Sequence, residues 1–235
     1  MLIAQRIVSE IADNNLPPGT PISPEKEMLA EFGVARGTLR EALRFLEIHG
    51  VITIKTGPGG GPMVARPGSR HLGGIIAMMM QLEHASFESV LEARATIEPT
   101  LARSAAEQIS DGAANDLYES IQRMRDNIED GDFFLAENER FHAAVSTASG
   151  NDLLAMVIGS LSWICDASPL GVEYPPESRE AVIEMHTKIA DAIAAHNPDA
   201  AEREMALHIE SFEIYLAKRY PQVIGDPIRW DQLEP

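Results

Sequence analysis

The stretch "VARGTLREALRFLEIHGVITIKTGPGGGPMV", residues 34–64, decides the fold of the N-terminal part of the chain. It opens with an amphipathic run in which Arg36 and Arg40 lie four residues apart, so both side chains occupy one face of the predicted helix. The run ends at Gly50, a residue type that commonly follows the last turn of a helix. The apolar positions expected to face the core are Leu39, Leu43, Leu46 and Ile48.

A β-hairpin is predicted directly after this helix. Residues 51–55, "VITIK", alternate and are β-branched, which is typical of a strand. "TGPGGGP" at 56–62 predicts a turn, and "MVA" at 63–65 predicts the return strand. Glycine has no side chain, so the tip of this turn can approach another molecule closely. The glycines concerned are Gly57, Gly59, Gly60 and Gly61.

Two helices are predicted before the quoted stretch. Residues 2–14 repeat apolar side chains on one face, namely Leu2, Ile3, Ile7 and Ile11. A second, short helix is predicted to start with Ser23 as N-cap and Pro24 at the first helical position. The order helix, helix, turn, helix, hairpin is that of a winged helix-turn-helix. In this motif, the helix that follows the turn reads the DNA major groove.

The pattern changes to long helices after residue 66. Breakers such as "SDG", "DG" and "HNP" separate candidates at about 70–83, 86–109, 112–129, 131–148, 151–166, 177–195 and 199–219. No strand signal of comparable strength follows, so the fold is predicted to be mainly α. We expect a winged helix-turn-helix domain at 1–66, a linker at 67–72, an all-helical domain at 73–220 and an extended or disordered tail at 221–235.

Charge is distributed unevenly between these parts. Residues 1–66 hold seven Lys/Arg and seven Asp/Glu, whereas the remainder of the chain accounts for the whole formal net charge of −17. An acidic surface repels nucleic acids and anionic membranes, and the neutral N-terminal part does not. The longest apolar run, "GGIIAMMM" at 73–80, is too short to cross a bilayer. The single cysteine, Cys165, suits a reducing environment, so we expect a cytoplasmic protein with no membrane partner.

The basic residues around the predicted recognition helix favour DNA binding. Arginine can donate two hydrogen bonds to guanine, and Arg36 and Arg40 lie at the helix end that meets base edges. Thr38 can reach a base or a phosphate, and Lys26 on the preceding helix can reach a phosphate. The alternative is a solvated basic face on an ordinary helix pair.

Residues 16–60, "LPPGTPISPEKEMLAEFGVARGTLREALRFLEIHGVITIKTGPGG", resemble the N-terminal domain of the GntR family of bacterial transcription regulators. Two positions depart from the family pattern: Ala35 stands where serine is usual, and Lys26 stands where arginine is common. The resemblance implies that the DNA contacts are made by Lys26, Arg36, Thr38, Arg40, Thr56 and Gly57.

Histidines in the second domain suggest a metal site. Asn138 and His142 lie four apart on one face of a predicted helix, and His186 and His208 lie on two later antiparallel helices. Imidazole is the commonest ligand of transition metals in proteins. From the spacing alone, the stronger interpretation is that these are ordinary core or surface histidines.

"EARATIEP" at 92–99, "NERFHAAVSTASGN" at 138–151 and the pair of later histidines resemble the FCD domain, the all-helical ligand-binding domain of the fatty-acid-regulator-like branch of the family. The resemblance implies a divalent metal ion (zinc, nickel or manganese). Asn138 stands where the family has an aspartate ligand, and Glu139 is an alternative to Asn138 as the ligand at this position. The implied ligands are Asn138, His142, His186 and His208.

Arg94 matches a family arginine that lines the same cavity, which implies a contact with the carboxylate of an effector. The alternative for this residue is a surface salt bridge with Glu98 at i+4. Both interpretations remain open from the sequence.

Three functions follow from these features. The first is a ligand-responsive repressor and not an enzyme: a homodimer that binds a palindromic DNA operator and is released by a small carboxylate effector bound at the metal-containing pocket. The second is a metal-dependent hydrolase or isomerase with an N-terminal domain that tethers it to DNA. The third is an architectural DNA binder with a dimerisation domain and no ligand.

Overall fold

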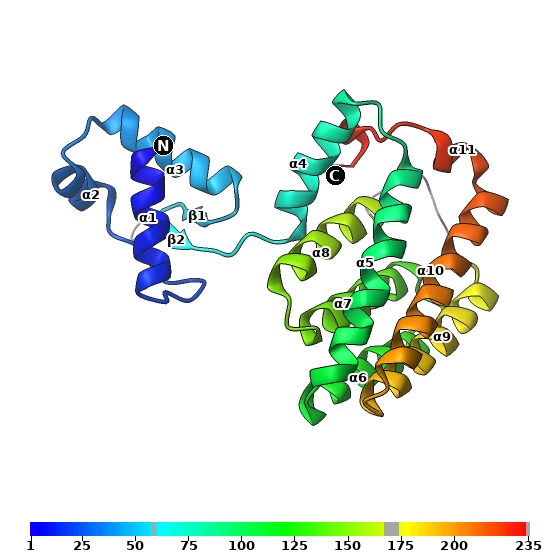
Figure 1. Cartoon of the computed structure of the whole chain (residues 1–235). Helices are drawn as coiled ribbons and strands as arrows, with labels where there is room; N and C mark the ends of the chain where they lie inside the picture. Colours follow the sequence, from blue (N-terminus) through cyan, green and yellow to red (C-terminus); the bar gives the residue numbers. More distant parts are fainter. Residues whose placement is uncertain (58–59, 167–173, 234–235) are drawn as a thin grey trace. The chain divides into compact units, whose positions relative to one another are not determined.

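The computed structural model describes residues 1–57, 60–166 and 174–233. These residues form two compact units, Met1–His71 and Leu72–Pro235 (Figure 1). Within the described ranges, each helix is either too short or too polar to span a membrane.

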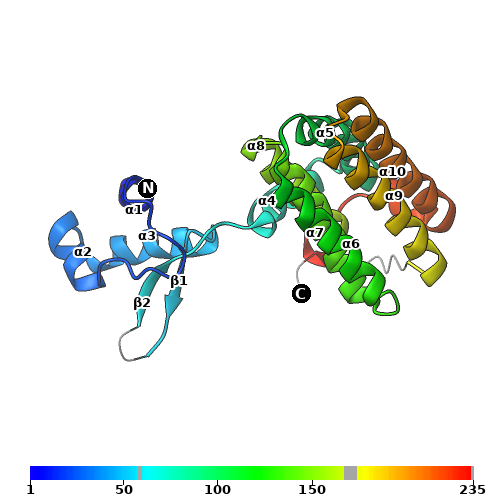
Figure 2. The ribbon, with the colours of Figure 1, turned by 90° about the horizontal axis from the view of Figure 1, so that it is seen from below.

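The first unit has the order of elements that the sequence predicts. It contains α1 (Leu2–Asp13), α2 (Glu25–Phe32), α3 (Arg36–Ile48), β1 (Ile52–Lys55) and β2 (Gly61–Val64). The strands pair antiparallel, with Ile52 opposite Val64, and Figure 2 shows them as a hairpin next to α3. Pro58 and Gly59 of the predicted turn lie outside the described residues.

The core of this unit confirms most of the predicted inward positions. Leu39, Leu46 and Ile52 are at most 1% exposed, and Ile7 of α1 is 2% exposed. Ile48 was expected to face inward, and this expectation is wrong because the side chain is 63% exposed. At about 100° per residue, Ile48 lies about 180° around the helix from Leu39. Leu2 was expected on the buried face of α1 but is exposed, because successive residues lie about 100° apart around a helix and the neighbouring Ile3 takes the buried position.

The helix boundaries correct one predicted cap. Pro24, and not Ser23, is the N-cap of α2, and no side-chain hydrogen bond caps this end. Pro24 has the extended backbone of a cap residue, with ψ 149°, so the helix begins one residue later than predicted. Gly33 ends α2 in the left-handed conformation, with φ 64°, which glycine adopts readily.

The second unit is all-helical within the described residues. Its main helices are α4 (Ser69–Leu82), α5 (Phe87–Gln108), α6 (Asp111–Asp126), α7 (Gly131–Ala148), α8 (Asp152–Asp166), α9 (Pro176–Ala194) and α10 (Pro198–Arg219). α4 begins at Ser69, inside the segment that the sequence predicts as a linker. α5 packs against α7, α8, α9 and α10 and is therefore the central helix of the bundle.

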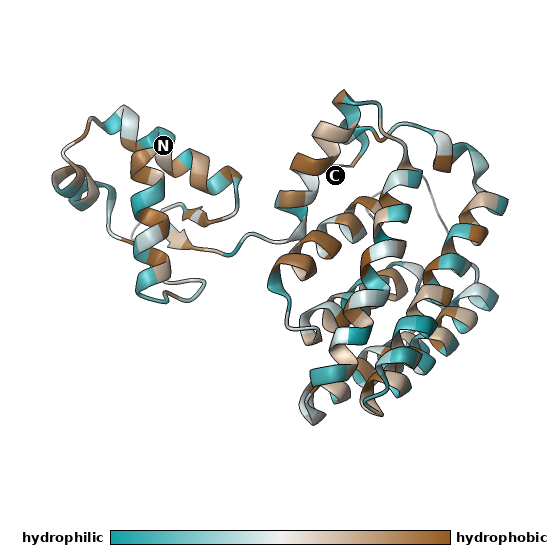
Figure 3. Cartoon of the chain, viewed as in Figure 1, coloured by the Kyte–Doolittle hydropathy of each residue, from teal (hydrophilic) through white to brown (hydrophobic). Residues whose placement is uncertain are grey.

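Local signals fix where the three histidine-bearing helices begin. The Asp130 side chain accepts a hydrogen bond from Phe133 N at the start of α7, and Asn197 accepts one from Ala200 N at the start of α10. α9 starts with Pro176 at its first position. Hydrophobic residues recur along all three helices, as the brown segments of the ribbon show (Figure 3). Side chains from these helices form one buried cluster that includes Phe134, Phe141, Ile183, Ile189, Met205 and Ile209.

The C-terminal segment differs from its prediction. An extended or disordered tail was expected, but α11 (Pro221–Gly225) and a 3₁₀ turn (Trp230–Gln232) form in its described part. Ile228 and Leu233 are buried against a cluster that contains Phe87. Phe87 N also donates to Asp226 O. The regularly spaced apolar residues of the segment supply enough contact to dock it, although its overall composition is polar.

Gly50 provides a test of this fold. It follows α3 with φ 69°, and a Cβ at this position would collide with the ring of His71. Gly50→Ala should destabilise the first unit by about 1–2 kcal/mol, because L-residues pay for the left-handed conformation. Amide hydrogen exchange of residues 1–71 in the full chain measures this change.

Gly37→Ala is the matched control. Gly37 lies in the first turn of α3, and no atom lies within 4 Å of an added Cβ. Alanine should therefore stabilise the unit by up to about 0.5–1 kcal/mol. Equal exchange rates in parent and Gly50→Ala would contradict the assigned turn.

Candidate functional site

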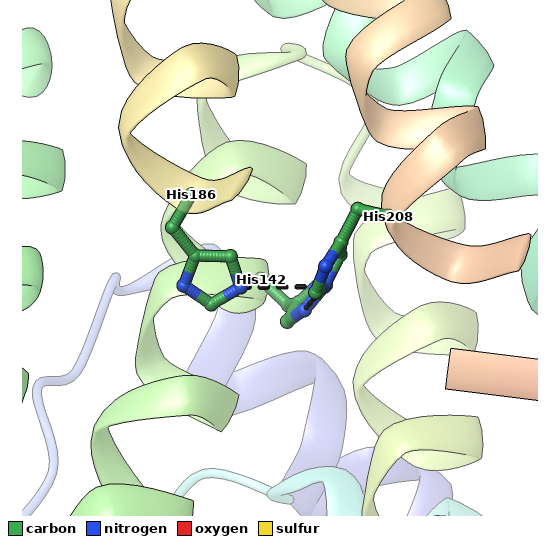
Figure 4. Close-up of side chains that lie close together, drawn as sticks. All are labelled: His142, His186 and His208. Atoms are coloured by element: carbon green, nitrogen blue, oxygen red, sulfur yellow. Dashed lines mark hydrogen bonds between the residues drawn. The ribbon is translucent and has the colours of Figure 1, made fainter. Parts of the chain in front are cut away.

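Three histidines meet in the interior of the helical unit. His142 comes from α7, His186 from α9 and His208 from α10, and their exposed fractions are 2%, 0% and 6%. Figure 4 shows the three rings turned toward one another. The structure thus brings together three of the four residues that the family resemblance implies as metal ligands.

Their Nε2 atoms converge. His208 Nε2 lies 3.1 Å from His142 Nε2 and 3.3 Å from His186 Nε2. The available ligand atoms of the three residues all lie within 4.8 Å of one another. Nitrogen atoms bound to one transition-metal ion at about 2.0–2.1 Å have comparable mutual separations. The convergence is therefore what a shared ion requires.

Glu98 orients the cluster. Its Oε2 lies 2.5 Å from His142 Nδ1, and its Oε1 accepts a hydrogen bond of 2.6 Å from Arg94 Nε. Burial raises the pKa of the Glu98 carboxyl, but the adjacent Arg94 and His142 outweigh it and hold this pKa well below its usual range. The ionised carboxylate accepts a hydrogen bond from Nδ1–H of His142, which leaves the Nε2 lone pair pointing into the cluster.

The other two imidazoles are uncharged. Burial, followed by repulsion from neighbouring histidines, lowers the pKa of His186 well below its usual value. Burial also lowers the pKa of His208, to about 3. Neutral imidazoles keep the lone pair that a metal needs.

Protons alone do not satisfy this arrangement. His208 Nε2 faces the Nε2 atoms of both His142 and His186, and a single N–H group can serve only one of these two contacts. The Nδ1 atoms of His186 and His208 also lack a hydrogen-bond partner among the described residues. A divalent cation would accept all three Nε2 lone pairs, so these residues fit a metal ion.

A cavity of about 160 Å³ adjoins the cluster. Asn138 lines it one turn before His142 on α7, whereas Glu139 does not border it. Among the described residues, the lining consists of Arg94, Asn138, His142, Tyr174, Ser178, Ala181, Val182, Met185, His208, Ile209, Ser211, Phe212 and Tyr215. The cavity therefore has a polar end at the histidines and a largely apolar remainder.

Arg94 pairs with Glu98 and also borders the cavity, so its position is compatible with both interpretations that the sequence left open. It forms the i+4 ion pair with Glu98, but the pair is buried and not on the surface, with side chains 5% and 2% exposed. The same residue borders the cavity. The role of Glu98 toward His142 was missed by sequence reasoning. Its only local signal was the Arg94 spacing, because the contact with His142 spans 44 positions of sequence.

The residues proposed to contact DNA are on the surface of the first unit. Lys26, Arg36 and Thr38 are exposed, and so are the hairpin residues Thr56 and Gly57. The Arg40 side chain is 71% exposed and forms an ion pair of 3.2 Å with Glu25. Such an exposed pair is weak, so it does not prevent Arg40 from contacting another partner.

Two family models match the chain. Residues 2–60 match the model described as "Bacterial regulatory proteins, gntR family", and residues 89–211 match the FCD domain. The second match alone covers more than half of the chain.

Curated relatives agree with these matches. The HTH-type transcriptional repressor NanR of Citrobacter rodentium is 29% identical over 201 residues, which are 82% of this chain and 75% of the relative. NanR of Escherichia coli K12 is 28% identical over 201 residues, 82% of this chain and 74% of the relative. Both relatives are transcription regulators, so they give no support to the hydrolase or isomerase alternative.

Solved structures share the fold. A GntR protein of Streptococcus agalactiae aligns with a TM-score of 0.69 and 23% identity, over 91% of this chain and 98% of its own. McbR/YncC of Escherichia coli aligns with a TM-score of 0.50 and 18% identity, over 93% of this chain and 97% of its own. The helix-turn-helix unit, the helical unit and the two matched models thus lead to one conclusion: the chain belongs to the GntR family, carries an FCD domain, and is a ligand-responsive, DNA-binding transcription regulator.

Proposed function

We propose that the protein is a cytoplasmic repressor that binds a palindromic operator as a homodimer and is released by a small carboxylic acid. The observation that carries the proposal is the buried cluster of three convergent histidines, two of which, His142 and His208, border one cavity together with Arg94. The curated NanR relatives, which are repressors, support the direction of regulation.

The metal ion would be held by His142, His186 and His208, with Asn138 as a fourth, neutral ligand. Three imidazoles suit zinc, nickel or manganese and leave coordination positions open. When bound, the ion supplies positive charge and exchangeable positions for a ligand oxygen. Glu98 keeps His142 in the tautomer that ligates.

Charge balance explains why the effector would be an anion. The formal charges of Arg94 and Glu98 cancel in their buried pair, and imidazoles that bind a metal through Nε2 are neutral. With the ion bound, the positive charge of the cavity would therefore be that of the divalent ion. A carboxylate that reaches both the ion and Arg94 would offset part of this charge, although the chain as a whole is strongly acidic.

DNA binding is assigned to the exposed face of α2 and α3 and to the hairpin. Arg36, Thr38 and Arg40 lie at the N-terminal end of α3, the end that meets base edges in helix-turn-helix proteins. Lys26 would contact phosphate, as would Thr56 and Gly57. Two copies related by two-fold symmetry would read the two halves of a palindrome.

The first test concerns base recognition. Arg40→Ala should weaken binding to the operator by about 1–3 kcal/mol and relax the preference at one base position. Lys26→Ala should weaken binding to all DNA sequences alike, because phosphates carry no sequence information. Titration of operator variants measures both effects. Arg203→Ala, an exposed change on α10, is the control, and an Arg40→Ala profile identical to that of this control would remove the assigned contact.

The second test concerns metal. The purified protein should hold about one divalent ion per chain, and saturation at about 100 times Kd should stabilise it by about 2.7 kcal/mol. His142→Ala, His186→Ala and His208→Ala should each lower occupancy, and Asn138→Asp should raise affinity by adding a negative ligand. Elemental analysis and thermal unfolding report these changes.

His84→Asn is the matched control for this series. His84 is exposed, and asparagine tolerates its left-handed backbone, with φ 53°. It removes one imidazole and should leave metal content unchanged. Absence of metal binding in the parent on titration with zinc, nickel and manganese would contradict the site.

The third test concerns Arg94. Alanine would leave Glu98 as an unpaired buried charge, so Arg94→Lys is the sharper change, because it keeps the charge and loses the two-pronged geometry. In the parent, an acid selected by thermal shift should lower operator affinity about 5- to 150-fold. Arg94→Lys should bind the operator normally and require at least about tenfold more acid for release, a loss of about 1.4 kcal/mol. Release at the parent's acid concentration would exclude Arg94 as the carboxylate partner.

A further inference from the structure

The part of the cavity away from the histidines is aromatic. The ring of Tyr174 lies parallel to that of Tyr215, with centroids 5.5 Å apart and an interplanar angle of 8°. It is also stacked with Phe212, with centroids 6.0 Å apart. All three residues line the cavity, and we refer to Tyr174, Phe212 and Tyr215 as the aromatic wall.

The aromatic wall continues directly into the cationic end. The guanidinium carbon of Arg94 lies 6.0 Å from the centre of the Phe212 ring. Phe212 and His208 lie four residues apart on α10, on one face, and both border the cavity. A molecule that occupies the cavity would therefore meet Arg94 and the metal ligands at one end and aromatic rings at the other.

The size of the cavity limits what can enter. At about 160 Å³, it is close to the cavities of about 150 Å³ that hold a benzene molecule. Its remaining walls include Val182, Met185 and Ile209, which offer no hydrogen-bonding side chain, and Ser178, which offers one hydroxyl. Ser211 already donates to Leu207 O. A polyhydroxylated acid would place hydroxyl groups against these carbon surfaces, at a cost in desolvation.

We infer that the effector is a monocyclic aromatic carboxylate. Its carboxylate lies at Arg94 and the metal ion, and its ring packs against the aromatic wall. The inference rests on the proposed carboxylate-responsive function and specifies the chemical class of the ligand. Offset or edge-to-face packing with Phe212 favours a flat ring over an aliphatic or sugar body of similar size.

The test compares three acids on the full chain loaded with zinc: phenylacetate, glucuronate and lactate. Isothermal titration should give phenylacetate an affinity at least about tenfold higher than that of either other acid. Operator titration should show the same order of potency. Phe212→Leu keeps an apolar side chain in the half-buried position and should weaken phenylacetate about three- to tenfold. Ile214→Ala, an exposed change on the same helix, should have no effect.

Each alternative result has a defined meaning. Glucuronate or lactate binding as tightly as phenylacetate would overturn the aromatic class and leave the carboxylate-responsive function standing. Unchanged phenylacetate affinity in Phe212→Leu, with a thermal unfolding curve like that of the parent, would overturn the contact with the aromatic wall. Failure of all three acids to bind the zinc-loaded parent would count against the carboxylate site itself, and the inference would fall with it.

Discussion

The helical unit depends on one buried carboxylate. Glu98 is 2% exposed and lies between Arg94 and His142, with both of its oxygens in short charge-assisted contacts. A buried charge is costly unless its partners satisfy it completely. The Arg94 guanidinium offsets that cost by pairing with one carboxylate oxygen, and His142 satisfies the other oxygen. The hydrogen-bonded triad Arg94–Glu98–His142 therefore determines which nitrogen of His142 carries the proton. It thereby also determines the direction in which this histidine can bind a metal.

The triad Arg94–Glu98–His142 also influences the charge of the cavity. An arginine alone would attract any anion, but here its charge is cancelled by Glu98 before a ligand arrives. In the proposed site, attraction would then come mainly from the metal ion, while Arg94 would contribute direction and hydrogen bonds. Selection among small carboxylates would therefore depend on the shape of the cavity, because electrostatic attraction does not distinguish one small carboxylate from another. This division of roles gives the aromatic wall its importance in the proposed ligand class.

Periodicity and breakers in the sequence were sufficient to predict the helices and the hairpin. Arg36 and Arg40 could be placed on one face because four residues nearly complete a helical turn. The site was harder. His142, His186 and His208 lie on separate helices, so their convergence depends on how α7, α9 and α10 are rotated in the bundle. The resemblance to a known family, and not the spacing, pointed to it. Glu98 could not be found in this way because its decisive contact is long-range. The docked tail was missed because a few apolar residues outweigh a polar average.

The triad Arg94–Glu98–His142 would also couple the binding of the proposed metal ion to the binding of the proposed acid. An acid that hydrogen-bonds Arg94 competes with Glu98 for the guanidinium, and a metal bound to His142 Nε2 strengthens the Nδ1–H donor that faces Glu98. Each event therefore shifts the Glu98 carboxylate toward His142. Binding of one ligand thus prepares the arrangement that the other requires, which makes the coupling positive. By thermodynamic linkage it must also be reciprocal: the acid has to raise the affinity for metal by the same factor by which the metal raises the affinity for acid.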